Sequence, residues 1–167
     1  MNIMLPDWNL RPVTVAHLLN PAFCGEVIRR CAYNFQKTED GNNCLPFQLA
    51  FVILPLILHK DIREALPLKS SKNFITWIEE NQSVKMKLPS LIKSIVPFTK
   101  EAIQFLMMYE VVKINEIGAI EVIVNSPKNT IIENEVAECY KKAELVGKWL
   151  AKSGNSQSIF INLGIKP

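Results

Sequence analysis

One stretch, residues 45–58, constrains the fold more than any other because it is almost entirely apolar. Its sequence, LPFQLAFVILPLIL, contains a single polar side chain, Gln48. A helix that is apolar on every side must be enclosed by protein or lipid. At about 1.5 Å of rise per residue, the run spans about 21 Å, which is short of the roughly 30 Å of a hydrocarbon core. The stretch is therefore predicted to be the central buried helix of a globular protein.

The run contains a proline and is followed directly by charged residues. Pro55 lies within it and is expected to kink or divide the helix. A buried strand at 51–54 is the alternative, but the length of the run and its lack of turn residues favour a helix. Charged residues follow, and His59, Lys60 and Arg63 are expected to project from the end of the core element. They either face solvent or form a contact patch for a partner.

Length and composition predict one ordinary globular domain over residues 1–167. A chain of 167 residues buries about 70% of its extended surface, which is enough for a true core. Apolar residues make up 49% and charged residues 21%, as in typical globular proteins. The net charge of +3 is too small to indicate nucleic-acid binding by itself.

The cysteines do not form a recognisable metal or disulfide framework. No two of them are spaced as C-x-x-C, and His17 and His59 do not complete a zinc site at the usual spacings. The first residues lack a basic segment followed by an apolar one, so no secretory signal is visible. We therefore expect reduced cysteines, no metal or other cofactor, and a cytoplasmic protein. The cysteines are Cys24, Cys31, Cys44 and Cys139.

The N-terminal part, residues 15–67, is predicted to be helical. Asn20-Pro21 is a typical start signal, because Asn can cap a helix and Pro suits its first position. Apolar residues then recur about one turn apart as far as Phe35, which predicts a helix with one buried face. A polar loop over residues 36–43 separates this helix from the central one.

Residues 70–125 have the layout of a winged helix. Three helices are expected, the last two joined by a turn at residues 97–99. Two β-rich runs follow and flank a loop that contains Gly118, as in a hairpin. Helix, turn, helix and two-stranded hairpin are the parts of a winged helix. The expected elements are helices at 71–82, 88–96 and 100–109 and strands at 111–114 and 120–124.

The C-terminal part, residues 130–165, is predicted to hold a helix and a strand. Thr130 and Glu133 match a capping box at the helix start, and the helix should bury Val136 among other apolar residues. The run SIFINLGI at 158–165 is β-rich and is expected to add a third strand to the wing. The predicted fold is thus mostly α with a small sheet (α+β), a winged-helix-like core with extra helices at both ends.

No catalytic constellation stands out, so an enzyme is not expected. His59 is the one candidate general base, and it would need an orienting carboxylate. Asp61 is near in sequence, but residues two apart on a helix point away from each other. The glycines are scattered and form no phosphate-binding loop.

The winged-helix layout raises the question of nucleic acid. Its second helix would offer Lys100 beside Glu101 and little else, although groove readers usually cluster Arg, Lys, Asn or Gln. The wing loop carries Glu116 and no cation. A basic group is nevertheless available to touch phosphates, unless it only keeps the surface soluble. Its members are Lys85, Lys87, Lys93 and Lys100.

Several stretches together resemble a known family. They are NPAFC at 20–24, LPLILHK at 54–60, PFTKEAIQF at 97–105 and LGIKP at 163–167. In these residues the chain resembles the middle component of bacterial three-component ABC systems. The resemblance extends from about residue 20 to the end of the sequence, and its most specific parts are the first two stretches.

This resemblance implies a non-catalytic accessory subunit. Such proteins are similar to the small subunit of Lamassu-type defence systems, encoded beside an SMC- or Rad50-like ATPase with a long coiled coil and an effector, often a nuclease. The accessory subunit is thought to bridge the two in a complex that senses foreign DNA of plasmids or phages.

The matched stretches also supply candidates for a partner surface. The same residues can instead serve as a helix cap and as core, which is the ordinary role of the first three. The candidates are Asn20, Pro21, Phe23, His59, Lys60 and Arg63.

Two other functions compete with this one. A stand-alone winged-helix transcription regulator would usually be a dimer and bind DNA in a salt-sensitive way. A small enzyme that uses His59 is the weaker alternative. Neighbouring genes would separate an assembly subunit from a regulator.

Overall fold

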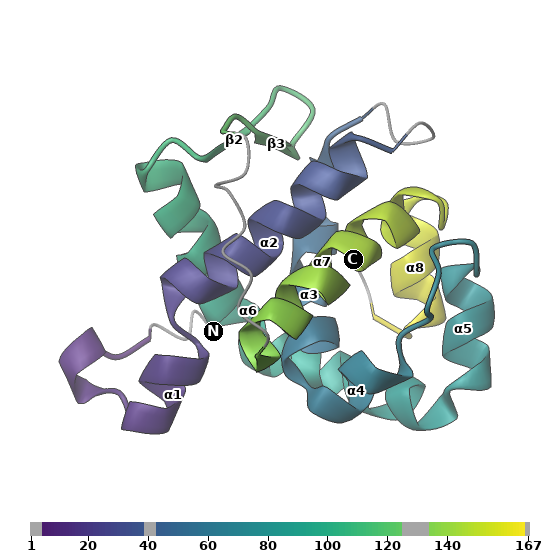
Figure 1. Cartoon of the computed structure of the whole chain (residues 1–167), viewed down its shortest axis with the longest axis horizontal. Helices are drawn as coiled ribbons and strands as arrows, with labels where there is room; N and C mark the ends of the chain where they lie inside the picture. The colour runs from purple at the N-terminus through teal and green to yellow at the C-terminus, as the bar shows by residue number, and fades with distance from the viewer. Residues whose placement is uncertain (1–4, 39–42, 125–133, 166–167) are drawn as a thin grey trace.

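The computed structural model describes residues 5–38, 43–124 and 134–165. Helices dominate it, and a small three-stranded antiparallel sheet lies at one end, which confirms the predicted α+β class (Figure 1). The elements before the centre of the chain are the 3₁₀ helix η1 (Trp8–Leu10), α1 (Val13–Leu18), α2 (Pro21–Gln36), β1 (Leu45–Pro46), the 3₁₀ helix η3 (Phe47–Leu49), α3 (Ala50–Leu58) and α4 (Lys60–Ala65). The remaining elements are α5 (Phe74–Glu80), α6 (Gln82–Met108), β2 (Val112–Ile114), β3 (Ala119–Val122), α7 (Glu135–Ala151) and α8 (Ser156–Asn162).

Helix α2 lies at the centre and packs along both α7 and α6 (Figure 1). Its start is as predicted. The Asn20 side chain accepts hydrogen bonds from the amides of Ala22 and Phe23, and Pro21 occupies the first position. The predicted apolar face is buried, and it includes Val27, Ile28, Cys31 and Phe35.

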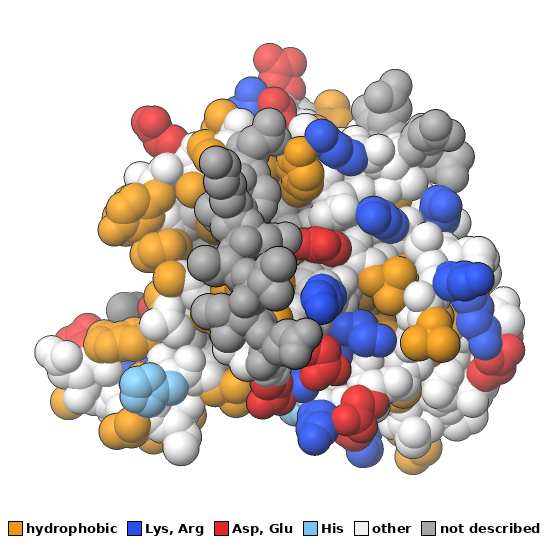
Figure 2. All heavy atoms as spheres, viewed as in Figure 1, with side chains coloured by type: hydrophobic (Ala, Val, Ile, Leu, Met, Phe, Trp, Pro, Cys, Tyr) orange, Lys and Arg blue, Asp and Glu red, His pale blue; other side chains and the backbone are white. Residues whose placement is uncertain are grey.

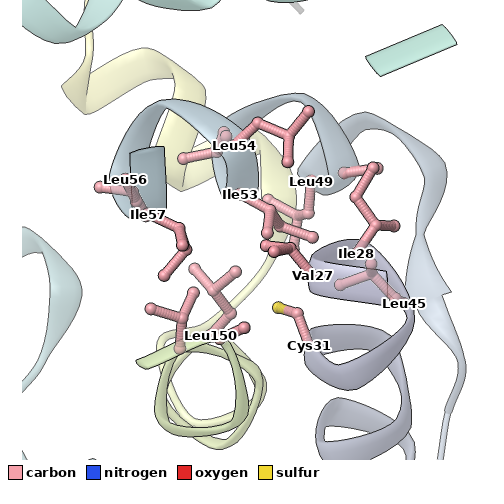
Figure 3. Close-up of a cluster of buried hydrophobic side chains, with 14 of the residues drawn as sticks. Val27, Ile28, Cys31, Leu45, Leu49, Ile53, Leu54, Leu56, Ile57 and Leu150 are labelled. Atoms are coloured by element: carbon pink, nitrogen blue, oxygen red, sulfur yellow. The ribbon is translucent and has the colours of Figure 1, made fainter. Parts of the chain in front are cut away.

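The apolar run is the core element, as predicted. Seven of the nine residues of α3 are buried, and Figure 3 shows their side chains meeting those of α2 and Leu150 of α7. A division of the helix at Pro55 is not observed, because α3 continues through this residue and ends at Leu58. The chain instead turns at His59, whose backbone is extended (φ −82°, ψ 113°), and this turn directs Ile62 and Arg63 of α4 back into the interior.

The expected helix-turn-helix is wrong. Residues 82–108 form one continuous helix, α6, that contains both Pro89 and Pro97. A proline inside a helix costs about 3 kcal/mol, which is why a turn was expected. The buried residues of α6 nevertheless keep a spacing of three or four across both prolines, so packing on α2 and α3 outweighs that cost. The buried residues are Val84, Leu88, Ile92, Ile95, Thr99, Ala102, Ile103 and Leu106.

The hairpin prediction is confirmed, but its third strand comes from elsewhere. β3 is the central strand of the sheet. β2 pairs with one of its edges, and the short strand β1, which precedes the core helix, pairs with the other. The amide of Val122 donates to Oε1 of Gln36 at 3.1 Å, which ties the sheet to the end of α2. The described part of the chain therefore contains no winged helix, since the hairpin follows a single long helix.

The last predicted strand is wrong as well, because residues 156–162 form helix α8. Asn155 caps it by accepting from the amide of Ser158 at 2.8 Å. Ile159, Phe160 and Leu163 are buried, a helical spacing that places them on one face. The preceding helix α7 is confirmed, with Asn134 as its cap. The predicted capping box at Thr130 and Glu133 lies outside the described residues.

Candidate functional site

A groove of about 930 Å³ opens between the N-terminal arm and the body of the molecule. Four helices and the end of α3 meet around it, and most of its lining is apolar. Residues far apart in the sequence therefore form one surface. The lining residues are Val13, Thr14, His17, Leu18, Asn20, Ala22, Phe23, Leu58, Arg63, Glu135, Val136, Cys139 and Tyr140. Because three of the six predicted partner residues are among them, we take this groove as the candidate site.

One wall of the groove is α1, a single helical segment that projects from the body (Figure 1). None of its residues is buried; Val13 is 70% exposed and Leu18 56% exposed. Figure 2 shows hydrophobic side chains on this arm. The arm is held by Arg11, whose guanidinium donates to both carboxylate oxygens of Glu101 on α6 at 2.6 and 2.8 Å. Hydrogen bonding to Glu101 raises the pKa of Arg11, despite partial desolvation.

The second wall joins the starts of α2 and α7. Phe23 packs on Tyr140 with ring centroids 5.9 Å apart, and the guanidinium of Arg30 lies 4.5 Å from the centre of the Tyr140 ring. Burial raises the pKa of Tyr140, so the phenol is neutral at pH 7. Among the predicted residues, Asn20 and Phe23 thus line the groove while also acting as cap and packing residue. Pro21 lies half-buried between them and does not line it.

Arg63 forms the polar part of the groove floor. Its side chain is 1% exposed. Nη1 donates to the Ile57 carbonyl at 2.7 Å, Nη2 donates to Glu135 Oε1 at 2.7 Å, and Nε lies 3.5 Å from Glu138 Oε1. Burial alone would lower the pKa of Arg63, but the hydrogen bond with Glu135 and the nearby carboxylates raise it. The expectation that Arg63 projects from the core is therefore wrong, because two carboxylates of α7 hold it inside.

His59 and Lys60 lie beside the groove and not in it. His59 is the half-buried junction between α3 and α4, and Lys60 is exposed, 3.9 Å from Glu64. Asp61, the nearest carboxylate in sequence to His59, instead accepts from Lys87 at 2.9 Å, which lowers the Asp61 pKa. This geometry gives His59 no orienting carboxylate from Asp61.

The sequence did not identify the residues that make the groove apolar and charged. Val13 precedes the predicted helical part at 15–67, and Leu18 lies inside it, but neither was predicted to line a surface. Val136 was expected in the buried stripe of its helix and is 41% exposed. Glu135 directly follows the cap of α7, where an acidic residue commonly complements the helix dipole, so its type and position do not mark it as part of a site. The sequence did contain one signal. The segment VTVAHL of α1 is mostly apolar, and a helix this short cannot bury those side chains by itself.

The predicted phosphate-binding lysines do not form one cluster. Lys85 and Lys100 are fifteen residues apart on α6, about 22 Å along its axis. Lys93 and Lys100 share a side of that helix, whereas Lys87 pairs with Asp61 of α4. Another hollow, of about 220 Å³, brings together Lys37, Lys148 and Lys152 at the ends of α2 and α7. Lysines there also complement two helix C-termini, which is their usual role.

The described residues form neither a metal-binding cluster nor a membrane-spanning helix. No group of three or more His, Cys, Asp or Glu residues is arranged to hold a metal ion within ranges 5–38, 43–124 and 134–165. Over the same ranges, no helix has both the length and the apolar character needed to cross a membrane.

Fold and groove together define a small, mostly helical protein with an open, mostly apolar groove. Comparison with known families then assigns it: the family model described as ABC-three component (ABC-3C) system Middle Component 3 matches residues 8–167. The chain belongs to this family, and the predicted resemblance to a middle component of three-component ABC systems is confirmed. No curated protein and no solved structure matches it.

Proposed function

We propose that the chain is a non-catalytic accessory subunit that connects other protein components of its ABC-three component system. The single observation that carries this proposal is the family match, which spans nearly the whole chain and describes a middle component. The open groove between α1 and α7 supports it, because an apolar surface of this kind favours protein contacts.

The partners we propose are those implied by the Lamassu-type resemblance. One is an SMC- or Rad50-like coiled-coil ABC ATPase, and the other is an effector of nuclease type. In this proposal the assembled complex responds to foreign DNA of phages or plasmids and controls the effector. DNA contact by this subunit is secondary, because its predicted lysines are spread along α6.

The absence of catalysis is part of the proposal. His59 is the residue on which an enzymatic alternative depended, and Asp61 is turned to Lys87. The transcription-regulator alternative depended on a winged helix, and α6 runs unbroken through the expected turn. Within the part of the chain that the structure describes, no specific feature favours either alternative over an assembly role.

Co-purification tests the proposal. The tagged chain is expressed together with its neighbouring genes, and the expected result is a stable complex with a coiled-coil ATPase on size exclusion. The proposal is overturned if the chain elutes alone while the ATPase is present and soluble. As a control, Lys113→Ala, on the sheet far in sequence from the groove, should leave the complex intact.

A further inference from the structure

We propose that the groove binds an amphipathic helix from another component of the same system, one that presents aliphatic side chains to the groove and a lysine or arginine to Glu135 and Glu138. This inference deepens the proposed function and rests on it. It assigns the surface, the shape of the bound segment and its charge.

The apolar walls determine the apolar side of the occupant. Leu18 on α1 and Val136 on α7 are both substantially exposed, and the half-buried rings of Phe23 and Tyr140 lie between the helices. Exposing such a contiguous apolar surface to water is unfavourable in free energy. Covering it with aliphatic side chains removes this unfavourable contribution. Methyl and methylene groups therefore fit this surface better than polar ones.

The charges at the rim determine the polar side of the occupant. Glu135 and Glu138 both approach one guanidinium, that of Arg63, at 2.7 and 3.5 Å. Two carboxylates against one cation leave one net negative charge. The carboxylates are accessible, with 71% and 45% of their side chains exposed, whereas Arg63 is enclosed. Tyr140 and Cys139 add no charge of their own, because burial raises the pKa of both and keeps them neutral.

The construction of the groove favours a helix over an extended peptide. Its walls are α1, α2 and α7, in which backbone groups are already paired within each helix. An added β-strand needs an open sheet edge, and the lining of the groove contains none of the strand residues. A helix satisfies its own backbone and binds apolar grooves through side chains at positions i, i+3, i+4 and i+7.

Photo-crosslinking in the complex identifies the occupant directly. A benzoylphenylalanine is placed at Leu18, with Leu68 as the matched control because that leucine is 90% exposed and lies outside the groove. The expected crosslink from position 18 joins another component at a segment with helical aliphatic spacing and a Lys or Arg. A crosslink to an acidic segment, to a second copy of this chain, or none in an intact complex overturns the inference.

Matched substitutions measure the contributions of apolar contact and charge. Leu18→Asp should lower the apparent affinity for the purified partner at least tenfold, and Leu68→Asp should change it less than twofold. Glu135→Gln keeps an oxygen that can accept from Arg63 but removes the charge, so we expect a several-fold loss and a weaker dependence on salt. Circular dichroism and thermal unfolding verify that each variant is folded.

The outcomes separate this inference from the function on which it rests. If the unaltered chain forms no complex, the proposed function fails. If it forms a complex that Leu18→Asp and Glu135→Gln leave unchanged, the subunit role stands and the groove is not the binding surface. If Leu18→Asp does not fold, Glu135→Gln and the crosslink from position 18 still decide the question.

Discussion

Gly147 of α7 packs directly against the backbone of Cys31 on α2. A Cβ built on Gly147 would lie 2.2 Å from the carbonyl oxygen of Cys31, closer than real Cβ contacts come. The two central helices therefore approach each other as closely as they do because residue 147 has no side chain. The same pair of helices carries Phe23 and Tyr140 to the groove, so this contact sets the position of its second wall.

We predict that Gly147→Ala destabilises the protein by about 1–3 kcal/mol, as overpacking of a core does. The higher helix propensity of Ala, worth about 1 kcal/mol, acts in the opposite direction and is outweighed by the clash. Urea unfolding of the variant and the parent measures this change in the free energy of unfolding. Gly25→Ala is the matched control, because its Cβ would meet the flexible Leu106 side chain at 3.1 Å and not a backbone atom. Equal stability of the Gly147 variant and the parent would contradict the tight contact.

The buried guanidinium of Arg63 should be required for stability. We predict that Arg63→Met lowers the free energy of unfolding by about 2 kcal/mol, because the Ile57 carbonyl loses a donor inside the core. Lys60→Met, three residues earlier on α4, should change it by less than about 0.5 kcal/mol, since Lys60 is exposed and 3.9 Å from Glu64. Denaturant titrations of both variants provide the comparison. Equal effects would mean that Arg63 is not an interior residue.

Periodic apolar patterns in the sequence predicted the elements that carry the core. The stripe of α2, the all-apolar α3 and the hairpin of β2 and β3 each follow a local rule that tertiary packing reinforces. The start of α2 was predicted down to the cap, because Asn20-Pro21 acts through hydrogen bonds and backbone angles that depend only on adjacent residues.

The errors arose where distant contacts override local preference. Pro97 favours a turn locally, but Ile95 and Thr99 on either side of it both face the interior, which keeps α6 continuous. Residues 158–165 have strand propensity, yet Asn155 and the spacing of Ile159 and Leu163 make them helical. The burial of Arg63 depends on carboxylates more than seventy residues away, which no local pattern reveals.

Acid should destabilise the protein through Glu26. Burial alone would raise the pKa of Glu26, but hydrogen bonds from Arg29 and Arg30 at 2.6 Å hold it below its ordinary value of 4.5. An acid whose pKa is lower when folded binds protons more tightly when unfolded. Its stabilising contribution is thus complete above pH 4.5 and is lost as the pH falls through the folded-state pKa.

Replacing this carboxylate should show the same dependence. We predict that Glu26→Gln costs about 2 kcal/mol at pH 7, because two buried guanidinium groups lose a charged partner. The difference from the parent should shrink steadily below about pH 4.5. Urea unfolding from pH 3 to pH 7 measures it, with the exposed Glu79→Gln as the control. A difference that stays constant over that range would rule out this role for Glu26.

Thiol reactivity should single out one cysteine. Burial raises the pKa of Cys24 to about 12 and also raises those of Cys31 and Cys139, all three enclosed in the core. Cys44 is half-buried, so reagent reaches it more readily even though its pKa is also raised. At pH 8 we predict that a disulfide reagent labels Cys44 first and the others only on unfolding. Mass spectrometry locates the label, and a Cys44→Ser variant should show no early phase.

The ion pair between Arg11 and Glu101 should hold α1 in place. Arg11→Lys keeps the charge but loses the paired geometry of two hydrogen bonds to one carboxylate, a loss of about 1 kcal/mol. We predict that amide exchange over residues 13–18 becomes roughly fivefold faster, since 1.4 kcal/mol corresponds to about tenfold.

Because α1 has no buried residue, overall stability should hardly change, and exchange in α8 serves as the internal reference. If the arm loosens in this way, the wall that carries Leu18 also loses its position, and capture of the partner helix should weaken with it. Unchanged exchange over 13–18 would mean that contacts other than this ion pair fix the arm.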